Sequence, residues 1–294
     1  MKLLPLIYNP VARGGRGRVP EKKLAAVAAS FGFQLELWPT QAPGHATELA
    51  AQARRGGCEY VAVWGGDGTY NEAAQGLVNG STAMVILPGG TTSVLAYELG
   101  LPRKPVESLA VQLGGETRKL FLGRTDKGQI FLLMLSVGPD ALILHNLPPL
   151  WKRYAGKAGI TFQAVVEFFR ARLPSFSVQA NGSSMTAGWC IVGNSRCYGG
   201  PFAATPGADP FRPGLEAVVH TRRGRAAAIP FFFAIPLGKH LRLEGVVRFA
   251  TDKITLAADG QVPYQLDGDP GGFLPVTAYA SEEYVPVRAR RPVR

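Results

Sequence analysis

The stretch Gly65-Gly66-Asp67-Gly68-Thr69-Tyr70-Asn71-Glu72 is the part of this sequence that says most about its fold and its ligand. It follows the apolar run 60–64 and precedes the helix-forming run 73–77, so the predicted order is strand, glycine-rich turn and helix. Glycines let the backbone approach a ligand where a Cβ would collide, and the N–H groups at a helix start suit a phosphate. Asp67 adds a carboxylate, which predicts nucleotide phosphates with a metal ion or a reacting hydroxyl nearby. The alternative is a tight turn in which Asp67 only caps the helix.

Composition indicates a folded protein with two domains. The chain has 294 residues, of which 46% are hydrophobic and 18% are charged. Its three cysteines and four histidines are widely spaced and match no metal-site spacing, so we do not expect a zinc site, and the cysteines favour a reducing compartment. The apolar stretch within residues 1–10 is too short for a signal peptide, and the apolar run 229–237 is too short to span a bilayer. We therefore expect a cytoplasmic protein that is at most peripheral to a membrane.

The net charge of +11 favours anionic partners such as lipid surfaces, phosphorylated ligands or nucleic acid. Basic residues are not interleaved with stacking aromatics, so nucleic-acid binding is not expected. Part of the charge lies in the last seven residues, which resemble a solvated basic tail: Arg288, Arg290, Arg291 and Arg294.

The first 120 residues alternate strand-like and helix-like segments. Strands are predicted over 3–8, 33–38, 60–64 and 83–87, and helices over 21–31 and 46–55. This rhythm predicts a parallel sheet with helices on both faces, an α/β domain of three layers. Ligands of such sheets bind beyond the carboxyl ends of the strands, where the loops after these four strands begin.

From about residue 121 to residue 287 the pattern changes to alternating strands. They are predicted over 129–137, 175–179, 186–192, 215–220, 242–249 and 253–257, with one helix over 158–172. We expect a mainly antiparallel, sandwich-like second domain, a basic tail over 288–294, and an active site in the cleft between the two domains.

Together these segments resemble the diacylglycerol kinase catalytic domain family, which includes bacterial lipid kinases and sphingosine kinases and is distantly related to NAD kinases. The resemblance runs from Asn9-Pro10 to about residue 287, and Gly65 to Glu72 is its most specific part. Leu87-Pro88-Gly89-Gly90-Thr91 resembles the family's second glycine-threonine loop. The segments 194–206 and Leu266-Asp267-Gly268-Asp269 resemble two parts of the β-rich domain.

This resemblance implies an ATP- and Mg²⁺-dependent lipid kinase that reaches its substrate at a membrane surface. The implied nucleotide-binding residues are Asn9, Arg13, Thr40, Gly65, Gly66, Asp67, Gly68, Thr69, Asn71, Glu72, Gly90 and Thr91. No protein metal site is expected, because Mg²⁺ would arrive with the nucleotide. The oligomeric state is not readable from the sequence.

Two carboxylates compete for the role of general base. The family's bacterial members use the acid of an Asp-Gly-Glu motif, which corresponds to Asp269 here, and its sphingosine-type members suggest Asp67. Asp269 is one methylene shorter than the glutamate that it replaces, so its geometry differs. It could instead be a turn residue, because Asp-Gly and Pro-Gly pairs favour turns.

Three departures from the family are visible. Ser93-Val94 stands where the family has Asn-Asp, and Asp269 replaces a glutamate. Pro213-Gly214 replaces an Asp-Gly that helps to hold a structural magnesium, so we expect that accessory site to be absent. Two alternatives stay open: an NAD kinase-like enzyme with a soluble acceptor, and a nucleotide- or lipid-binding protein without catalysis.

Overall fold

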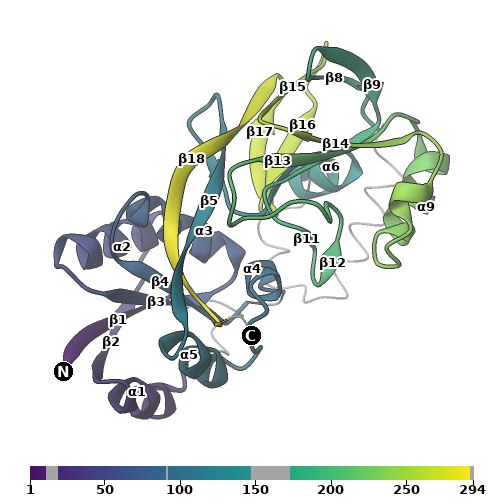
Figure 1. Ribbon diagram of the computed structural model, residues 1–294. Helices are drawn as coiled ribbons and strands as arrows, with labels where there is room; N and C mark the ends of the chain where they lie inside the picture. Colours follow the sequence, from purple (N-terminus) through teal and green to yellow (C-terminus); the bar gives the residue numbers. More distant parts are fainter. Residues whose placement is uncertain (11–18, 91, 147–172, 292–294) are drawn as a thin grey trace. The chain divides into compact units, whose positions relative to one another are not determined.

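The computed structural model describes residues 1–10, 19–90, 92–146 and 173–291 (Figure 1). The chain forms two compact units, Met1–Phe121 with Glu282–Arg294, and Leu122–Ser281. The helix predicted over 158–172 lies outside the described residues.

The N-terminal unit is built on a parallel sheet, as predicted. Its spatial order is β2 (Phe33–Pro39), β1 (Lys2–Tyr8), β3 (Tyr60–Gly65) and β4 (Ala83–Pro88). The last part of β18 (Val276–Ala289) adds to β4 in parallel. Because the chain steps from β1 out to β2 and then returns to β3, connections leave the neighbouring strands β1 and β3 in opposite directions. Such a switch point is where open α/β sheets bind ligands.

Helices cover both faces of this sheet (Figure 1). Helices α1 (Glu21–Ser30) and α5 (Pro105–Leu113) lie on one face, and α2 (His45–Arg55) and α3 (Asp67–Leu77) lie on the other. Alternate residues of three strands face α1 and α5 in one buried cluster: Leu4, Leu6, Ala62, Trp64, Val85 and Leu87. Their neighbours along the strands are buried too, which explains why β3 and β4 are continuous apolar runs rather than alternating ones.

The second unit is an antiparallel β-sandwich, also as predicted. One sheet has the order β14 (Val246–Thr251), β13 (Leu215–His220), β10 (Trp189–Gly193), β7 (Met134–Val137), β16 (Pro263–Leu266) and β17 (Asp269–Phe273). The other contains β18, β15 (Lys253–Ala257), β8 (Phe176–Ala180) and β9 (Ser183–Ala187). Strand β5 (Glu116–Thr125) pairs with β18 and with β6 (Ile130–Phe131). Apolar residues of both sheets form one buried cluster, as in other sandwiches.

Shorter elements complete the two units. They are α4 (Val94–Glu98), α6 (Pro139–Asn146), β11 (Cys197–Tyr198), β12 (Phe202–Ala203), α9 (Arg225–Ala234) and the 3₁₀ turn η2 (His240–Arg242). The sequence did not predict α9, and the strand expected from residue 242 begins at Val246.

The structure also corrects the expectation that Arg288 belongs to a solvated tail. Its side chain is buried at the end of β18 and lies over the ring of Tyr60, 4.7 Å from the centroid. The guanidinium donates hydrogen bonds to the carbonyl oxygens of Gln112, Leu113 and Gly115. Arg288 therefore ties the end of α5 to the sheet, whereas Arg290 is exposed.

Candidate functional site

Two glycine loops touch at the carboxyl ends of β3 and β4. The amides of Gly89 and Gly90 both donate to the carbonyl oxygen of Gly65, each at 2.8 Å. A Cβ on Gly90 would lie 2.7 Å from the Cα of Gly66, closer than real Cβ atoms come to a backbone carbon. The contact therefore requires glycine, and the two loops that sequence reasoning identified separately form one backbone surface.

A buried tyrosine contacts the backbone of both loops through its hydroxyl group. The hydroxyl of Tyr70 lies 2.8 Å from the carbonyl oxygen of Gly65 and 2.9 Å from that of Leu87. Burial is the main cause that raises the pKa of Tyr70, so the hydroxyl stays protonated and acts as a donor. Tyr70 thus belongs to the support of the loops, a role the sequence did not indicate.

Asp67 is the first residue of α3, and it joins the two loops. Its carboxylate oxygens accept hydrogen bonds from the backbone N–H groups of Val94 and Leu95, each at 2.9 Å. These N–H groups open α4, where no preceding helical turn supplies acceptors. Asp67 therefore caps α4 rather than α3, the helix that it begins and that has no side-chain cap.

Ser93, the residue directly before α4, has a left-handed backbone conformation with φ of 49°. Asparagine tolerates this conformation better than serine does, so Ser93 holds a backbone geometry that its own side chain does not favour.

The remaining residues of the first motif lie along the start of α3. Gly68, Thr69, Asn71 and Glu72 are all partly exposed. Asn71 accepts a hydrogen bond from Gln75, and the carbonyl oxygen of Glu72 accepts one from Thr47 on α2. The backbone of Glu72 therefore serves to pack α3 against α2.

Asn9 and Thr40 follow β1 and β2 at the same edge of the sheet. The backbone N–H of Thr40 donates to the carbonyl oxygen of Tyr8 at 2.8 Å. This hydrogen bond joins the two segments that contain the predicted nucleotide-binding residues Asn9 and Thr40. Both side chains are partly exposed. Arg13 and Thr91 lie outside the described residues.

A small pocket adjoins the second glycine loop. Gly90, Ser93, Tyr97 and Arg103 help to line it, and the Arg103 guanidinium lies 5.2 Å from the centroid of the Tyr97 ring. Its volume of about 40 Å³ holds a few water molecules, not a nucleotide. A nucleotide would therefore lie over the glycine loops rather than inside this pocket.

In the second unit, Asp269 follows a tight hairpin turn. Asp267 and Gly268 have φ of 52° and 90°, the left-handed pair that suits a two-residue Asp-Gly turn between β16 and β17. The Gly268 amide donates to the side-chain oxygen of Gln265 at 2.7 Å. Asp269 is exposed just beyond this turn and pairs with Leu266 in the hairpin.

Asp267, rather than Asp269, is the structural acid of this motif. Its carboxylate accepts hydrogen bonds from the backbone N–H groups of Leu132, Leu133 and Met134 at 2.7 to 2.9 Å. The side chain of Asn194 donates to the carbonyl oxygen of Leu132 at 2.9 Å. The two family-like segments of this unit, 194–206 and 266–269, are thus brought together on the backbone of 132–134.

Asp140, at the start of α6, is an acid near this turn that was not expected from the sequence. It accepts a hydrogen bond from the Tyr198 hydroxyl at 2.9 Å and lies 3.5 Å from the side-chain nitrogen of Gln265. Burial raises the pKa of this carboxyl above its ordinary value of 3.8, and the hydrogen bonds oppose that effect in part. Because Gln265 also holds Gly268, Asp140 is connected to the turn before Asp269. The signal in the sequence that could have indicated Asp140 is Gly138-Pro139-Asp140, which lies where a strand ends and a helix begins.

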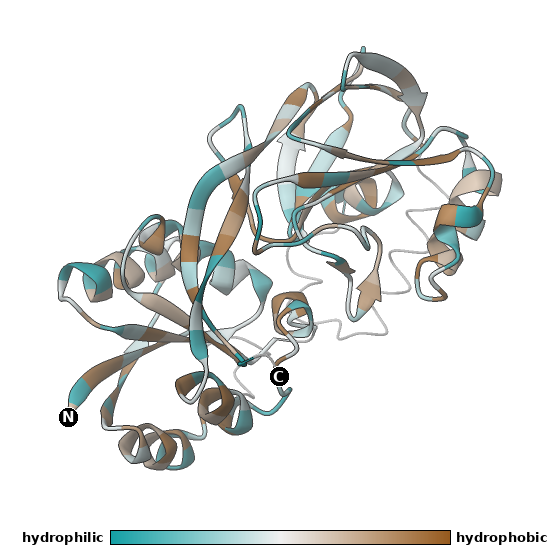
Figure 2. Cartoon of the chain, in the orientation of Figure 1, coloured by the Kyte–Doolittle hydropathy of each residue, from teal (hydrophilic) through white to brown (hydrophobic). Residues whose placement is uncertain are grey.

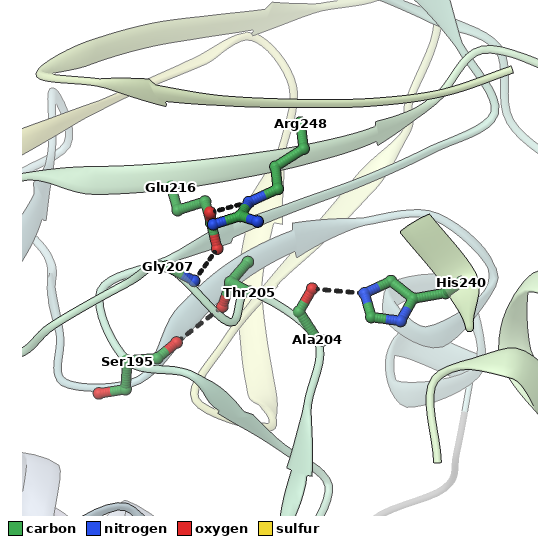
Figure 3. Close-up of polar contacts among 7 residues, drawn as sticks. All are labelled: Ser195, Ala204, Thr205, Gly207, Glu216, His240 and Arg248. Carbon is green, nitrogen blue, oxygen red and sulfur yellow. Dashed lines mark hydrogen bonds and ion pairs between the residues drawn. The ribbon is translucent and has the colours of Figure 1, made fainter. Parts of the chain in front are cut away.

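An ion pair fixes the end of the loop 194–207 (Figure 3). The guanidinium of Arg248 on β14 pairs with Glu216 on β13, and the other Glu216 oxygen accepts the Gly207 amide at 2.8 Å. The side chain of Glu216 is 6% exposed and that of Arg248 is 45% exposed. The carboxylate is therefore largely desolvated and depends on these two partners.

Two further contacts hold the beginning and the last part of the same loop (Figure 3). The Thr205 hydroxyl donates to the carbonyl oxygen of Ser195 at 2.7 Å, and His240 Nε2 lies 2.9 Å from the carbonyl oxygen of Ala204. Burial lowers the pKa of His240, which favours the neutral ring that donates from Nε2. The loop is thus held at residues 195, 204, 205 and 207.

The geometry of the paired glycine loops suits a phosphate. Within the ranges that the structure describes, no group of three or more His, Cys, Asp or Glu side chains could hold a metal ion. The paired glycine loops, in contrast, leave backbone that a Cβ would cover, next to the N-terminus of α3.

Comparison with known families gives two matches that together span most of the chain. Residues 4–125 match the diacylglycerol kinase catalytic domain, and residues 135–289 match the YegS C-terminal NAD kinase beta sandwich-like domain. The boundary between the matches falls shortly after the start of the second unit.

Individual relatives agree with these matches. The chain is 24% identical to the diacylglycerol kinase of Bacillus subtilis over 94% of this chain and 92% of that protein. It is 30% identical to a Pseudomonas aeruginosa protein named "Probable lipid kinase YegS-like", over 64% of each chain, so this match spans less than two thirds of that relative. A crystal structure of a diacylglycerol kinase from Bacillus anthracis shares the fold, with a TM-score of 0.71, 19% identity and coverage of 98% of this chain and 96% of that one. Within the described ranges, no helix is long and apolar enough to cross a membrane.

Proposed function

The chain belongs to the diacylglycerol kinase catalytic domain family, a family of lipid kinases, and on that premise we propose that it transfers the γ-phosphate of ATP to a lipid hydroxyl. The observation that carries this proposal is the contact between Gly66 and Gly90, which joins two glycine loops beside the start of α3. Backbone amides and a helix N-terminus bind phosphates without covalent chemistry, which is what phosphoryl transfer requires.

In the proposed reaction the acceptor oxygen forms a bond to the γ-phosphorus. The bond from that phosphorus to the β,γ-bridging oxygen breaks, ADP leaves, and the hydroxyl proton passes to a carboxylate and then to water. Magnesium bound to the nucleotide would neutralise phosphate charge. We assign the carboxylate to Asp269, because its side chain is exposed to solvent directly after a hydrogen-bonded turn, where an acceptor hydroxyl can reach it.

The test is transfer of labelled phosphate from ATP to lipids in mixed micelles. Diacylglycerol, phosphatidylglycerol and a sphingoid base should be compared as acceptors, with NAD as a soluble acceptor. We expect a labelled lipid with the wild-type protein and a kcat about 10²- to 10⁴-fold lower in Asp269→Asn at unchanged ATP affinity. The matched control is Asp259→Asn, which changes another exposed aspartate of the second unit.

The other outcomes separate the remaining alternatives. Labelled NADP without labelled lipid would replace this proposal by an NAD kinase-like activity. Binding of ATP without transfer to any acceptor would favour a binding protein. Loss of activity in Asp67→Asn alone, with that variant fully stable, would move the base to Asp67.

A further inference from the structure

Helix α9 has apolar side chains of two kinds, some buried and some exposed. Phe231 and Ala228 point inward and are buried. The ring of Phe231 lies 5.1 Å from the rings of both Trp189 and His220, measured between centroids. This aromatic contact anchors α9 to the second unit through one face of the helix.

Other large apolar side chains of α9 and of the turn that follows it are exposed, although the ring of Phe232 also stacks 6.5 Å from that of Trp189. Phe233 is 66% exposed, Leu237 is 68% exposed, and Phe232 and Ile229 are exposed as well. In Figure 2 the α9 ribbon carries hydrophobic colouring beside hydrophilic segments. Single exposed apolar residues are normal in soluble proteins, but a cluster of large ones within nine residues indicates an interaction surface.

Basic residues flank this apolar face on both sides. Residues 222–244 contain one acidic residue, Glu244, and five basic ones: Arg222, Arg223, Arg225, Lys239 and Arg242. Arg222 and Arg223 line a shallow hollow at the N-terminus of α9, and Glu244 pairs with Arg222. Apolar side chains flanked by arginine and lysine suit a bilayer that contains acidic lipids. The apolar side chains can enter the acyl region, and the basic ones can contact the anionic headgroups.

We propose that the exposed face of α9 docks on anionic bilayers, with Phe232, Phe233 and Leu237 entering the acyl boundary and the flanking arginines meeting lipid phosphates. The inference rests on the proposed function in one respect, because a lipid acceptor is presented in a membrane. The charge of the flanking residues selects a bilayer over an apolar protein partner. The prolines at 230 and 236 stiffen this segment, which lowers the entropy lost on docking.

The test measures binding to vesicles without ATP, so that it is independent of catalysis. Flotation with vesicles of phosphatidylcholine and phosphatidylglycerol should be compared with pure phosphatidylcholine vesicles. For the double variant Phe232→Ser/Phe233→Ser we expect the partition coefficient on anionic vesicles to fall about tenfold or more. The single variant Phe233→Ser spares the ring that stacks near Trp189 and should show a smaller fall. The matched control is Phe31→Ser, an exposed phenylalanine of the other unit, which should bind as the wild type does.

Several outcomes would overturn the inference. Vesicle binding that is unchanged in the double variant, or absent in the wild type, would exclude α9 as the docking surface. A dimer in sedimentation velocity that only the α9 variants dissociate, with vesicle binding unchanged, would assign the face to a second copy of the chain. Lipid phosphorylation in micelles, measured separately, reports on the proposed function, so failure of one proposal is distinguishable from failure of the other.

Discussion

Replacement of Asp67 by asparagine tests whether this carboxylate is first of all a structural element. Its two oxygens each accept a backbone N–H at 2.9 Å, from Val94 and Leu95. An asparagine has one acceptor oxygen, so its NH₂ group would face one of these N–H donors. The shape of the side chain is kept, but one hydrogen bond is lost and the other loses its charge.

The magnitude follows from these two bonds. A hydrogen bond to a charged group contributes about 1.5–3 kcal/mol net, and an unpaired buried donor costs about 1–3 kcal/mol. Because Asp67 is partly exposed, water will compensate for some of this loss. We therefore expect Asp67→Asn to lower the free energy of unfolding by about 2–4 kcal/mol, which corresponds to a Tm about 5–10 °C lower for a chain of this size.

The assay combines urea unfolding with amide hydrogen exchange. The exchange rates of the Val94 and Leu95 amides report the local loss, and the urea midpoint reports the global one. Asp259→Asn serves as the control and should leave both unchanged. An unfolding midpoint and exchange rates that stay at wild-type values in Asp67→Asn would refute the structural assignment and return Asp67 to the role of base.

Three further predictions concern the support of the two motifs. Tyr70→Phe should cost about 1–2 kcal/mol in urea unfolding, because it removes the buried donor below the glycine loops; an unchanged midpoint would show that water or the loop amides replace it. Burial raises the pKa of Asp140, so at pH values above its ordinary pKa of 3.8 the folded state binds more protons than the unfolded state does. The unfolding free energy of the wild type, relative to that of Asp140→Asn, should therefore fall as the pH rises from 3.8 toward the raised pKa of the folded state. A difference that rises or stays constant with pH would contradict this. Arg248→Met leaves the desolvated carboxylate of Glu216 without its cation. We expect the free energy of unfolding to fall by about 1–3 kcal/mol, a figure already reduced because the arginine is half exposed. A variant that is more stable than the wild type in thermal unfolding would show that the ion pair is unfavourable.

Much of the fold was predictable because local pattern and tertiary packing agree. Four parallel strands, their helices and the strand-rich second half follow from apolar periodicity, since buried β3 and β4 can only be continuous apolar runs. Helix α9 was missed because two prolines and three phenylalanines in succession do not indicate a helix. It forms because Phe231 finds an aromatic pocket made by Trp189 and His220, which is not visible in the local sequence.

The candidate site divides in the same way. By itself, the sequence determined the glycine loops, since only glycine permits the contact of Gly66 with Gly90, and it restricted the acids to a short set. The tertiary structure decided what each acid does: Asp67 caps α4, Asp267 binds the backbone of 132–134, and Asp269 is exposed. The physical reason is that a carboxylate's role depends on which N–H groups or solvent reach its oxygens, and those partners lie 27 to 135 residues away along the chain.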